Sequence, residues 1–311
     1  MKLISKPLIP LCRQTRLADR VILRLQNEVR FIYRKELRRK TLRMLPVYKM
    51  EDCFQPAIHM LVCKRDYEMA IVSAMTLNAL GNKGHLFIFH DDGSIDHKME
   101  SSIHHYLPGI KLIRRKSADK IIEETLCSYP AMLAFRRQQV LALKLIDVPF
   151  FSGQERIGYM DSDILFFQYP AVFFHQLSDK TNVNVFNKDI ANAYITDQNS
   201  IEERLGIKLT SRINSGLWVI NKMDFQFSVM ESWLKNPLIL SYLSDYRLEQ
   251  TMTAMLAGIS VAETEYFPVG YDVSFEKDPL HSVCKHYVGK IRYGYELEGL
   301  HNILNSNKHK Y

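Results

Sequence analysis

The chain has 311 residues, of which 47% are hydrophobic and 24% charged, and its formal net charge is +7. This size and composition are typical of a globular protein with one large or two small domains. No apolar run approaches the roughly 18 residues of a membrane-spanning helix, and residues 1–7 lack the apolar core of a signal peptide. We therefore expect a cytoplasmic protein that does not cross a membrane.

The cysteines are widely spaced and form no C-x-x-C pair, which disfavours a zinc site or a redox motif. Reduced thiols are the expected state in a cytoplasmic protein. The five residues are Cys12, Cys53, Cys63, Cys127 and Cys284.

Positive charge is concentrated at the N-terminus. Residues 1–50 hold 14 Lys or Arg and 3 Asp or Glu, a surplus of +11, so the remaining residues carry −4. Apolar residues at 3/4 spacing predict a helix over residues 17–45. The apolar stripe consists of Ala18, Val21, Ile22, Leu25, Val29, Ile32 and Tyr33.

A basic amphipathic helix of this kind lies on anionic lipid or follows phosphates. In the alternative interpretation, the stripe packs on the body beneath a solvated charged face, and both interpretations stay open. RNA binding is not expected, because few aromatic residues are available to stack on bases. Prolines at 46 and 56 mark a boundary, so we divide the chain into a basic helical arm, residues 1–55, and a body, residues 56–311.

The body alternates strands and helices, which predicts an α/β fold with a mostly parallel sheet flanked by helices. In the first half, strands are expected at 57–63, 85–89, 111–113 and directly before Asp161. Helices are expected at 67–80, 94–106, 117–127 and 131–146. The second half is more mixed, with strands expected at 183–186, 193–195 and 216–220 and helices at 223–234 and 246–257.

Asp161 and Asp163 interrupt the apolar run of residues 158–167. Burying even one unpaired carboxylate costs several kcal/mol, so the pair needs a neutralising partner. A divalent cation with oxygen ligands is the natural one, and open α/β sheets bind ligands at the carboxyl ends of their strands. A D-x-D triplet by itself is a weak signal; its position at a strand end gives it weight.

Four segments, in this order, carry a resemblance to a known family. They are residues 159–166 (YMDSDILF), residues 213–221 (INSGLWVIN), the pair at 249–250 (EQ) and residues 286–292 (HYVGKIR). Together they resemble the nucleotide-sugar-dependent glycosyltransferases of the GT-A fold, especially family 8 and its bacterial relatives. The likeness covers residues 58–292. It implies a Rossmann-like mixed sheet, a nucleoside diphosphate sugar as donor, with UDP-sugars favoured, and a saccharide or glycolipid acceptor.

The resemblance implies a metal site. Asp161, Asp163 and His286 match the residues that bind Mn²⁺ or Mg²⁺, and the imidazole favours Mn²⁺ slightly, since nitrogen is a borderline donor. Lys290 or Arg292 would add positive charge against the departing diphosphate. Arg292 stands where the family has a lysine. Gly289 belongs to the same segment and is also assigned to donor binding.

Further donor contacts are implied near the first strand and the D-x-D triplet. Cys63, Lys64 and Tyr67 match the nucleoside cradle, although the family is usually acidic there. Ser162 and Lys144 match positions that face the sugar nucleotide. For Tyr67, packing on its own domain stays open as an alternative, and so does a solvated loop charge for Lys64. For Lys144 the alternative is an ammonium that snorkels from an amphipathic helix to solvent.

Three catalytic residues are implied. Asn214 matches a residue that faces the donor sugar, and Gln250 matches one near the anomeric carbon in retaining enzymes. No isolated carboxylate stands out as the base of an inverting enzyme, so retention of the anomeric configuration is favoured. If the enzyme inverts the configuration instead, Glu249 and Asp272 are the candidate bases. A bulge or turn at residues 214–216 is the structural alternative for Asn214.

Two other functions are weighed against a transferase. A sugar-nucleotide pyrophosphorylase would carry a glycine-rich signature near the first strand, but no glycine occurs between Cys63 and Ala79. A non-catalytic phosphate- or membrane-binding module is disfavoured because Asp161, Asp163 and His286 are all intact. Peripheral contact of residues 1–50 with the inner face of an anionic membrane is compatible with the transferase.

Overall fold

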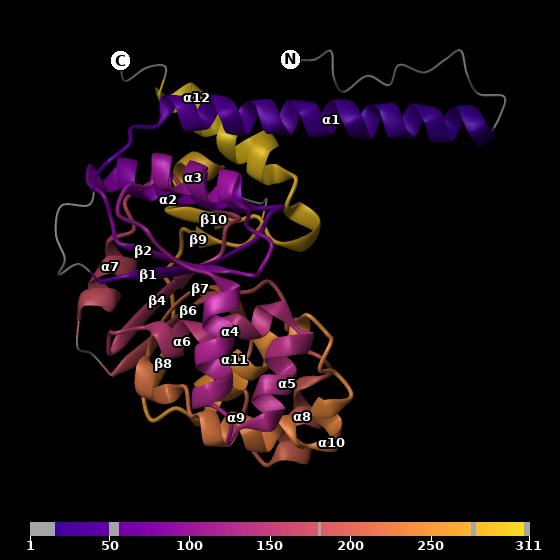
Figure 1. Ribbon diagram of the computed structural model, residues 1–311, viewed down its shortest axis with the longest axis vertical. Helices are drawn as coiled ribbons and strands as arrows, with labels where there is room; N and C mark the ends of the chain where they lie inside the picture. The colour runs from indigo at the N-terminus through magenta and orange to yellow at the C-terminus, as the bar shows by residue number, and fades with distance from the viewer. Residues whose placement is uncertain (1–15, 50–55, 180–181, 275–277, 308–311) are drawn as a thin grey trace.

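The computed structural model describes residues 16–49, 56–179, 182–274 and 278–307. Cys12 and Cys53 lie outside the described residues, and Cys63, Cys127 and Cys284 are free thiols. Within the described part, a seven-stranded sheet and a three-stranded sheet form the frame of the protein (Figure 1). The seven strands are, in spatial order, β3 (Lys111–Ile113), β2 (Phe87–Asp91), β1 (Ile58–Val62), β4 (Arg156–Met160), β7 (Ile213–Asn221), β6 (Val183–Lys188) and β8 (Glu263–Tyr266).

The large sheet is mostly parallel, as expected. β3, β2, β1 and β4 are parallel neighbours, whereas β7 pairs antiparallel with both β4 and β6. The small sheet contains β5 (Ile164–Phe166), β10 (Cys284–His286) and β9 (Tyr271–Asp272), in that order. Its middle strand, β10, pairs antiparallel with β5.

Helices cover both faces of the large sheet, because successive strand residues point to opposite sides and both sides are apolar (Figure 1). On one face lie α1 (Arg16–Met44), α2 (Tyr67–Gly81), α3 (His97–Tyr106), α7 (Ala171–Ser178) and α12 (His301–Asn307). On the other face lie α4 (Arg115–Thr125), α5 (Pro130–Gln138), α6 (Asp147–Phe151), α8 (Gln198–Leu205), α9 (Phe227–Leu234), α10 (Pro237–Leu240) and α11 (Arg247–Ile259).

Short helical turns link these elements. The 3₁₀ turns are η1 (Val140–Lys144), η2 (Lys222–Asp224), η3 (Pro279–His281) and η4 (Gly289–Ile291), and η5 (Tyr295–Leu300) is a π-helix. The expected mixed α/β fold is therefore confirmed.

Several of the expected elements are wrong in detail. The second strand runs over Phe87–Asp91 rather than over residues 85–89, and the helix expected at 223–234 begins at Phe227, after η2. Residues 131–146 do not form one helix: α5 ends because Gln139 is extended, and its side chain caps η1 by accepting the Leu141 N–H. Residues 193–195 are not a strand. Tyr194 and Ile195 are buried as irregular backbone, and the Tyr194 hydroxyl donates to the Thr210 carbonyl. Their apolar character therefore records burial rather than strand pairing.

Helix α1 matches the predicted helix within one residue at each end. Leu37, Leu42 and Leu45 at its C-terminal end are buried in the core shared with α2. Of the stripe residues whose burial is described, Val29 and Ile32 are 59% and 66% exposed, whereas Tyr33 is half-buried and packs against the core. The stripe therefore packs on the body at Tyr33 but not at Val29 or Ile32. No helix in the described ranges is both long and apolar enough to cross a bilayer. Residues 1–15 and 50–55 lie outside the description, and the domain division at residue 55 stays a prediction.

Candidate metal centre

Asp161 and Asp163 lie at the carboxyl end of β4, the central strand of the large sheet. All five residues of β4 are buried, and the strand ends where the first carboxylate begins. The Asp161 N–H donates to the Gly216 carbonyl over 2.7 Å, which ties the turn to β7. Asp163 is buried, and the Asp161 side chain is 23% exposed. The turn therefore presents both carboxylates at one edge of the sheet.

His286 reaches this edge from the far end of the chain. It is the last residue of β10, which places it opposite Ile164 at the start of β5. The Tyr287 N–H donates to the Asp163 carbonyl over 2.9 Å and holds the two segments together. As a result, one ligand atom each from Asp161, Asp163 and His286 lies within 4.8 Å of the others.

The hydrogen bonds of His286 fix which ring nitrogen faces the carboxylates. Asn214 Oδ1 accepts the Gly216 N–H over 3.0 Å, which sets the orientation of the amide. The same oxygen lies 2.9 Å from His286 Nδ1, so this nitrogen carries a hydrogen. Nε2 lies 3.1 Å from Asp163 Oδ1 and 3.6 Å from Asp161 Oδ2. It is buried and has no hydrogen-bond partner among the described residues.

A buried imidazole nitrogen aimed at two carboxylates fits a metal ligand whose other nitrogen is held by an amide. Burial lowers the pKa of His286, but the charges of Asp163 and Asp161 outweigh it and raise the pKa overall. A raised pKa means that the two carboxylates favour a positive charge on the ring, and a divalent cation bound at Nε2 supplies that charge in place of a proton. Two carboxylates and one imidazole suit Mn²⁺ or Mg²⁺, so the donor set fits the expected ion.

Lys144 lies behind Asp161, away from solvent. Its ammonium nitrogen is 2.9 Å from Asp161 Oδ1 and 3.6 Å from Glu249 Oε2, and it is 5.0 Å from the centre of the Tyr159 ring. Burial opposes its charge, but Asp161 and Glu249 raise the pKa of Lys144 overall. The snorkelling interpretation is therefore wrong, because only 4% of the side chain is exposed. Whether Lys144 touches a donor stays a prediction.

Glu249 completes this buried network. Its carboxylate accepts hydrogen bonds from Ser215 Oγ over 2.8 Å and from Thr253 Oγ1 over 3.1 Å. Burial raises the pKa of Glu249, and the nearby Lys144 ammonium limits the rise. The side chain thus faces the core and balances Lys144; its assignment as a base is not tested by this placement.

Asn214 and Gln250 share one carboxylate that no sequence motif marked. Asp189, one residue beyond β6, lies 3.1 Å from Asn214 Nδ2 and 3.4 Å from Gln250 Nε2 through the same oxygen. Asn214 lies within β7, where the pairing with β6 jumps from Phe186–Trp218 to Asn187–Asn214. The extra residues, 215–217, lie on β7, so an irregularity at the expected bulge is present directly after Asn214. Asp189 was therefore identified as part of the site only from its contacts with Asn214 and Gln250.

Arg292 lies at the rim of the centre. Its guanidinium is 3.3 Å from Asp163 Oδ2 and 2.6 Å from Asp66 Oδ2, and 34% of the side chain is exposed. Asp66 also pairs with Arg65, and the Cys63 thiol lies 3.5 Å from it. Asp66 was missed as well, although a lone acid at a basic strand exit was its signal.

The side chains of the other assigned residues make no described contact with those of the three ligands. Lys64 and Lys290 are exposed, and Tyr67 is half-buried at the start of α2. Gly289 has a φ of +57°, and Ser162 contributes its carbonyl to a hydrogen bond from Ser73. Asp272 lies on β9 and accepts from Ser282 Oγ. The donor and catalytic roles of these residues stay predictions.

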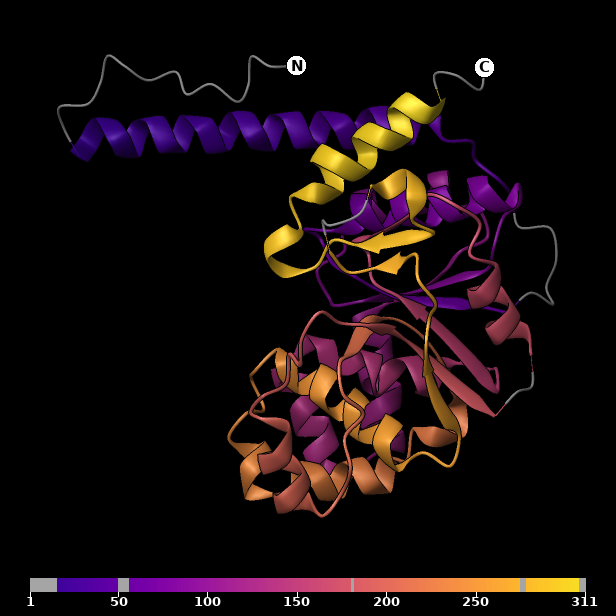
Figure 2. The same cartoon turned by 180° about the vertical axis from the view of Figure 1, so that it is seen from behind.

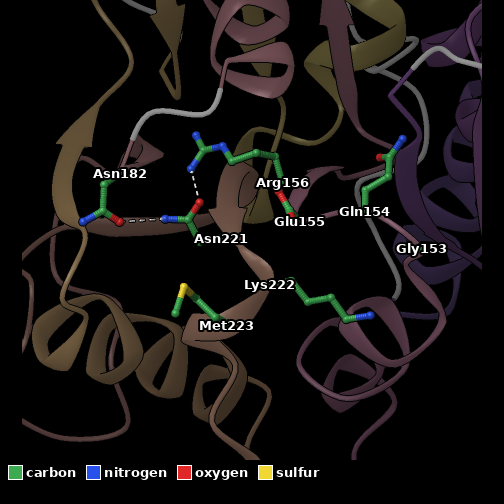
Figure 3. Close-up of a pocket in the computed structure, with 8 residues that line it drawn as sticks. All are labelled: Gly153, Gln154, Glu155, Arg156, Asn182, Asn221, Lys222 and Met223. Atoms are coloured by element: carbon green, nitrogen blue, oxygen red, sulfur yellow. Dashed lines mark hydrogen bonds between the residues drawn. The ribbon is translucent and has the colours of Figure 1, made fainter.

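A groove of about 710 Å³ opens at the other end of β4 (Figure 3). Its polar side chains bond to one another, with Arg156 donating to Asn221 and Asn221 donating to Asn182. Five strand residues, or about 16 Å, separate Arg156 from the metal centre. The groove is therefore not part of that centre. Its lining consists of Gly153, Gln154, Glu155, Arg156, Asn182, Asn221, Lys222 and Met223.

No protein-family model matches the chain, and no curated protein matches it by sequence. Three solved structures show its similarity to known folds. Mouse xyloside xylosyltransferase 1 is 11% identical, with 79% of this chain and 98% of that chain covered and a TM-score of 0.49. The galactosyltransferase LgtC, in complex with donor and acceptor sugar analogues, is 16% identical, with 80% and 95% covered and a TM-score of 0.46.

The third structure is core-mannan synthase A of Aspergillus fumigatus in its Mn/GDP form. It is 12% identical, with 73% of this chain and 78% of that chain covered and a TM-score of 0.41. Because all three TM-scores lie below 0.5, we base the function on the residues of the site.

Proposed function

We propose that the protein is a GT-A glycosyltransferase similar to family 8, which transfers a sugar from a nucleoside diphosphate sugar to a saccharide or glycolipid acceptor. A UDP-sugar is the favoured donor and Mn²⁺, or else Mg²⁺, the cofactor. One observation carries the proposal: Asp161, Asp163 and the lone pair of His286 Nε2 converge at the carboxyl end of the central strand. Ligands of open α/β sheets bind at this edge.

The chain's own residues supply the rest of the chemistry. Asp161, Asp163 and His286 would hold the cation, which would supply Lewis-acid stabilisation of the negative charge on the departing diphosphate. Arg292 adds a second positive group against the departing diphosphate, since its side chain is 34% exposed and its guanidinium lies 3.3 Å from Asp163. Lys144 holds Asp161 from behind, and Asn214 holds the imidazole of His286.

Retention of the anomeric configuration is part of the proposal. Glu249 is 2% exposed and its oxygens are engaged by Ser215, Thr253 and Lys144, which disfavours it as a solvent-side base. The amide of Gln250 is half-buried beside Asn214 and Asp189, and we assign it a place near the anomeric carbon. Cys63, Lys64 and Tyr67 remain the proposed nucleoside contacts.

A thermal-shift panel tests the proposal. Ligands that bind the native state raise the melting temperature. A ligand at 100 times its Kd adds about 2.7 kcal/mol to the free energy of unfolding. We expect UDP or a UDP-sugar to raise it in the presence of Mn²⁺ more than GDP or CMP does. Asp163→Ala should abolish the Mn²⁺-dependent shift and the transfer of sugar.

Asp179→Ala is the matched control, because it removes a carboxylate at the end of α7, outside the metal centre. It should behave like the unmodified protein. Transfer that persists in Asp163→Ala with EDTA present contradicts the metal role. A panel in which no nucleotide shifts the unmodified protein contradicts the proposed function as a whole.

A further inference from the structure

The N-terminal half of α1 extends beyond the rest of the protein, as Figures 1 and 2 show from opposite sides. At the point where the helix leaves the body, Val29, Phe31 and Ile32 are 59%, 66% and 66% exposed. Helices without tertiary packing are marginally stable in water, and clustered exposed apolar residues mark interaction sites. This part of α1 therefore needs a partner that covers it.

The exposed side chains define one face of the helix. At about 100° per residue, the buried Leu37, Thr41 and Leu42 centre on one side of the helix. Val29 and Ile32 lie roughly 150° away from that centre. All residues of this side are exposed from position 29 to position 43. We call it the outer face of α1, and it comprises Val29, Ile32, Glu36, Arg39, Lys40 and Arg43; Phe31 lies off it.

The inner side of α1 forms ion pairs with acidic residues of the body, and we call this contact the mount of α1. Arg38 Nε donates to Glu296 Oε1 over 2.8 Å, and Arg38 also lies 3.9 Å from Glu68. Arg34 lies 4.0 Å from Glu296. The basic residues that face the body thus have carboxylate partners there. The outer face carries three bases and one acid in solvent, so its surplus of positive charge is directed away from the protein.

We propose that the outer face of α1 docks on an anionic lipid bilayer. Val29 and Ile32 enter the boundary between headgroups and acyl chains, and Arg39, Lys40 and Arg43 contact the lipid phosphates. The aliphatic end of the face distinguishes this partner from a nucleic acid, for which aromatic stacking residues would be needed. Its positive surplus opposes pairing with the same face of a second copy. The proposal names a partner for the proposed transferase, whose glycolipid acceptor would lie in the same bilayer.

The mount of α1 is tied to the metal centre. η5 carries Glu296 and begins three residues after Arg292, whose carbonyl accepts the Tyr295 N–H over 3.1 Å. The Tyr295 hydroxyl donates to the Met69 carbonyl and lies 3.2 Å from Ser73 Oγ, which in turn donates to the Ser162 carbonyl between the two aspartates. These bonds connect the body residues that hold α1 to the metal centre, so that a docked enzyme keeps the metal centre in one orientation relative to the membrane surface.

Vesicle cosedimentation of the full chain tests the proposal. Phosphatidylcholine vesicles with and without phosphatidylglycerol are compared at low and high salt. We expect binding to the anionic vesicles that weakens with salt. The pair Val29→Glu and Ile32→Glu should weaken it at least about tenfold, since burial of these side chains is lost. The pair Lys40→Glu and Arg43→Glu should weaken it by a similar factor.

The matched control changes two exposed apolar residues elsewhere to the same acid. Val261 and Met223 are 89% and 80% exposed, and Val261→Glu with Met223→Glu should leave vesicle binding unchanged. Unchanged binding after substitution of Val29 and Ile32 overturns the proposal, and so does equal binding to neutral vesicles. A protein that does not bind either kind of vesicle, and that forms a dimer which these substitutions dissociate, also overturns the proposal.

The Mn²⁺-dependent thermal shift with UDP separates this inference from the proposed function. Loss of vesicle binding with an intact nucleotide shift supports docking through α1. If the unmodified protein binds vesicles but shows no nucleotide shift, the proposed function fails and the docking surface stands.

Discussion

Gly216 offers the sharpest test of the metal centre. It lies in β7, where its Cα faces the imidazole ring of His286. A Cβ added there would stand 2.6 Å from His286 Nδ1 and 2.9 Å from Nε2, and closer still to Cε1. Ordinary van der Waals contact begins at 3.4 Å, so the nearest ring atom, Cε1, has to move by about 1.3 Å to accept Gly216→Ala.

A displacement of this size exceeds what a metal ligand tolerates. Metal–ligand distances hold within about 0.2 Å, and disturbing the groups that orient a ligand lowers metal affinity about 10- to 100-fold. The shift also lengthens the 2.9 Å contact between His286 Nδ1 and Asn214. Overpacking in a filled core costs about 1–3 kcal/mol of stability, so the variant should still fold.

The assay is a calorimetric titration of Mn²⁺ into the protein with UDP present. Gly153→Ala is the matched control, since a Cβ at Gly153 meets no atom within 4 Å. We expect the control to bind Mn²⁺ normally and Gly216→Ala to bind it at least about tenfold more weakly. A Gly216→Ala variant that folds and keeps the affinity of the unmodified protein would falsify the assignment of His286 as a ligand.

Three further outcomes are expected. Lys144→Met should lower the free energy of unfolding by about 3–5 kcal/mol, since it leaves the carboxylates of Glu249 and Asp161 without their cation. Adding Glu249→Gln should recover part of this loss. Urea titration measures both changes, and an unchanged stability of Lys144→Met would contradict the network. Arg292→Ala should weaken UDP binding about tenfold and Arg292→Lys less, and equal affinities would refute the diphosphate contact. Burial lowers the pKa of His59 to about 3 and also lowers that of His90, so below pH 6.5 the unfolded state binds protons that the native state does not. The free energy of unfolding should therefore fall by about 1 kcal/mol for each ring as the pH drops from 6.5 to 5.5, and more steeply, towards about 1.4 kcal/mol per pH unit, just below that range. A flat profile would exclude this.

The two histidines show where sequence patterns misled. The strand expected at residues 85–89 left His90 outside it, but β2 continues through Asp91. His90 is 1% exposed, and its Nε2 lies 2.9 Å from Nδ1 of His59 on β1. A polar residue is compatible with a strand interior when a neighbouring strand supplies its partner. That partner is set by the parallel register of β1 and β2, which no local pattern encodes.

Local sequence patterns were sufficient to predict elements whose structure depends on the order and spacing of their own apolar and polar residues. The strand expected at residues 57–63 and the helix expected at residues 67–80 match β1 and α2 closely. The carboxylates at the end of β4 marked the ligand-binding edge, because two negative charges beside a buried strand are costly unless a cation neutralises them. The order of strands and helices predicted a mostly parallel sheet, since each element buries its own apolar side.

Pairings between distant segments were decided by the tertiary structure alone. The antiparallel register of β5 and β10 brings His286 onto Asp163, and Asn214 selects the ring nitrogen that faces the carboxylates. Likewise, the spacing of Val29 and Ile32 predicted an apolar stripe on a helix but not the direction in which it points. Hydrophobic periods record which side of an element avoids water, whereas partners and directions depend on how the elements pack, and packing is a property of the whole chain.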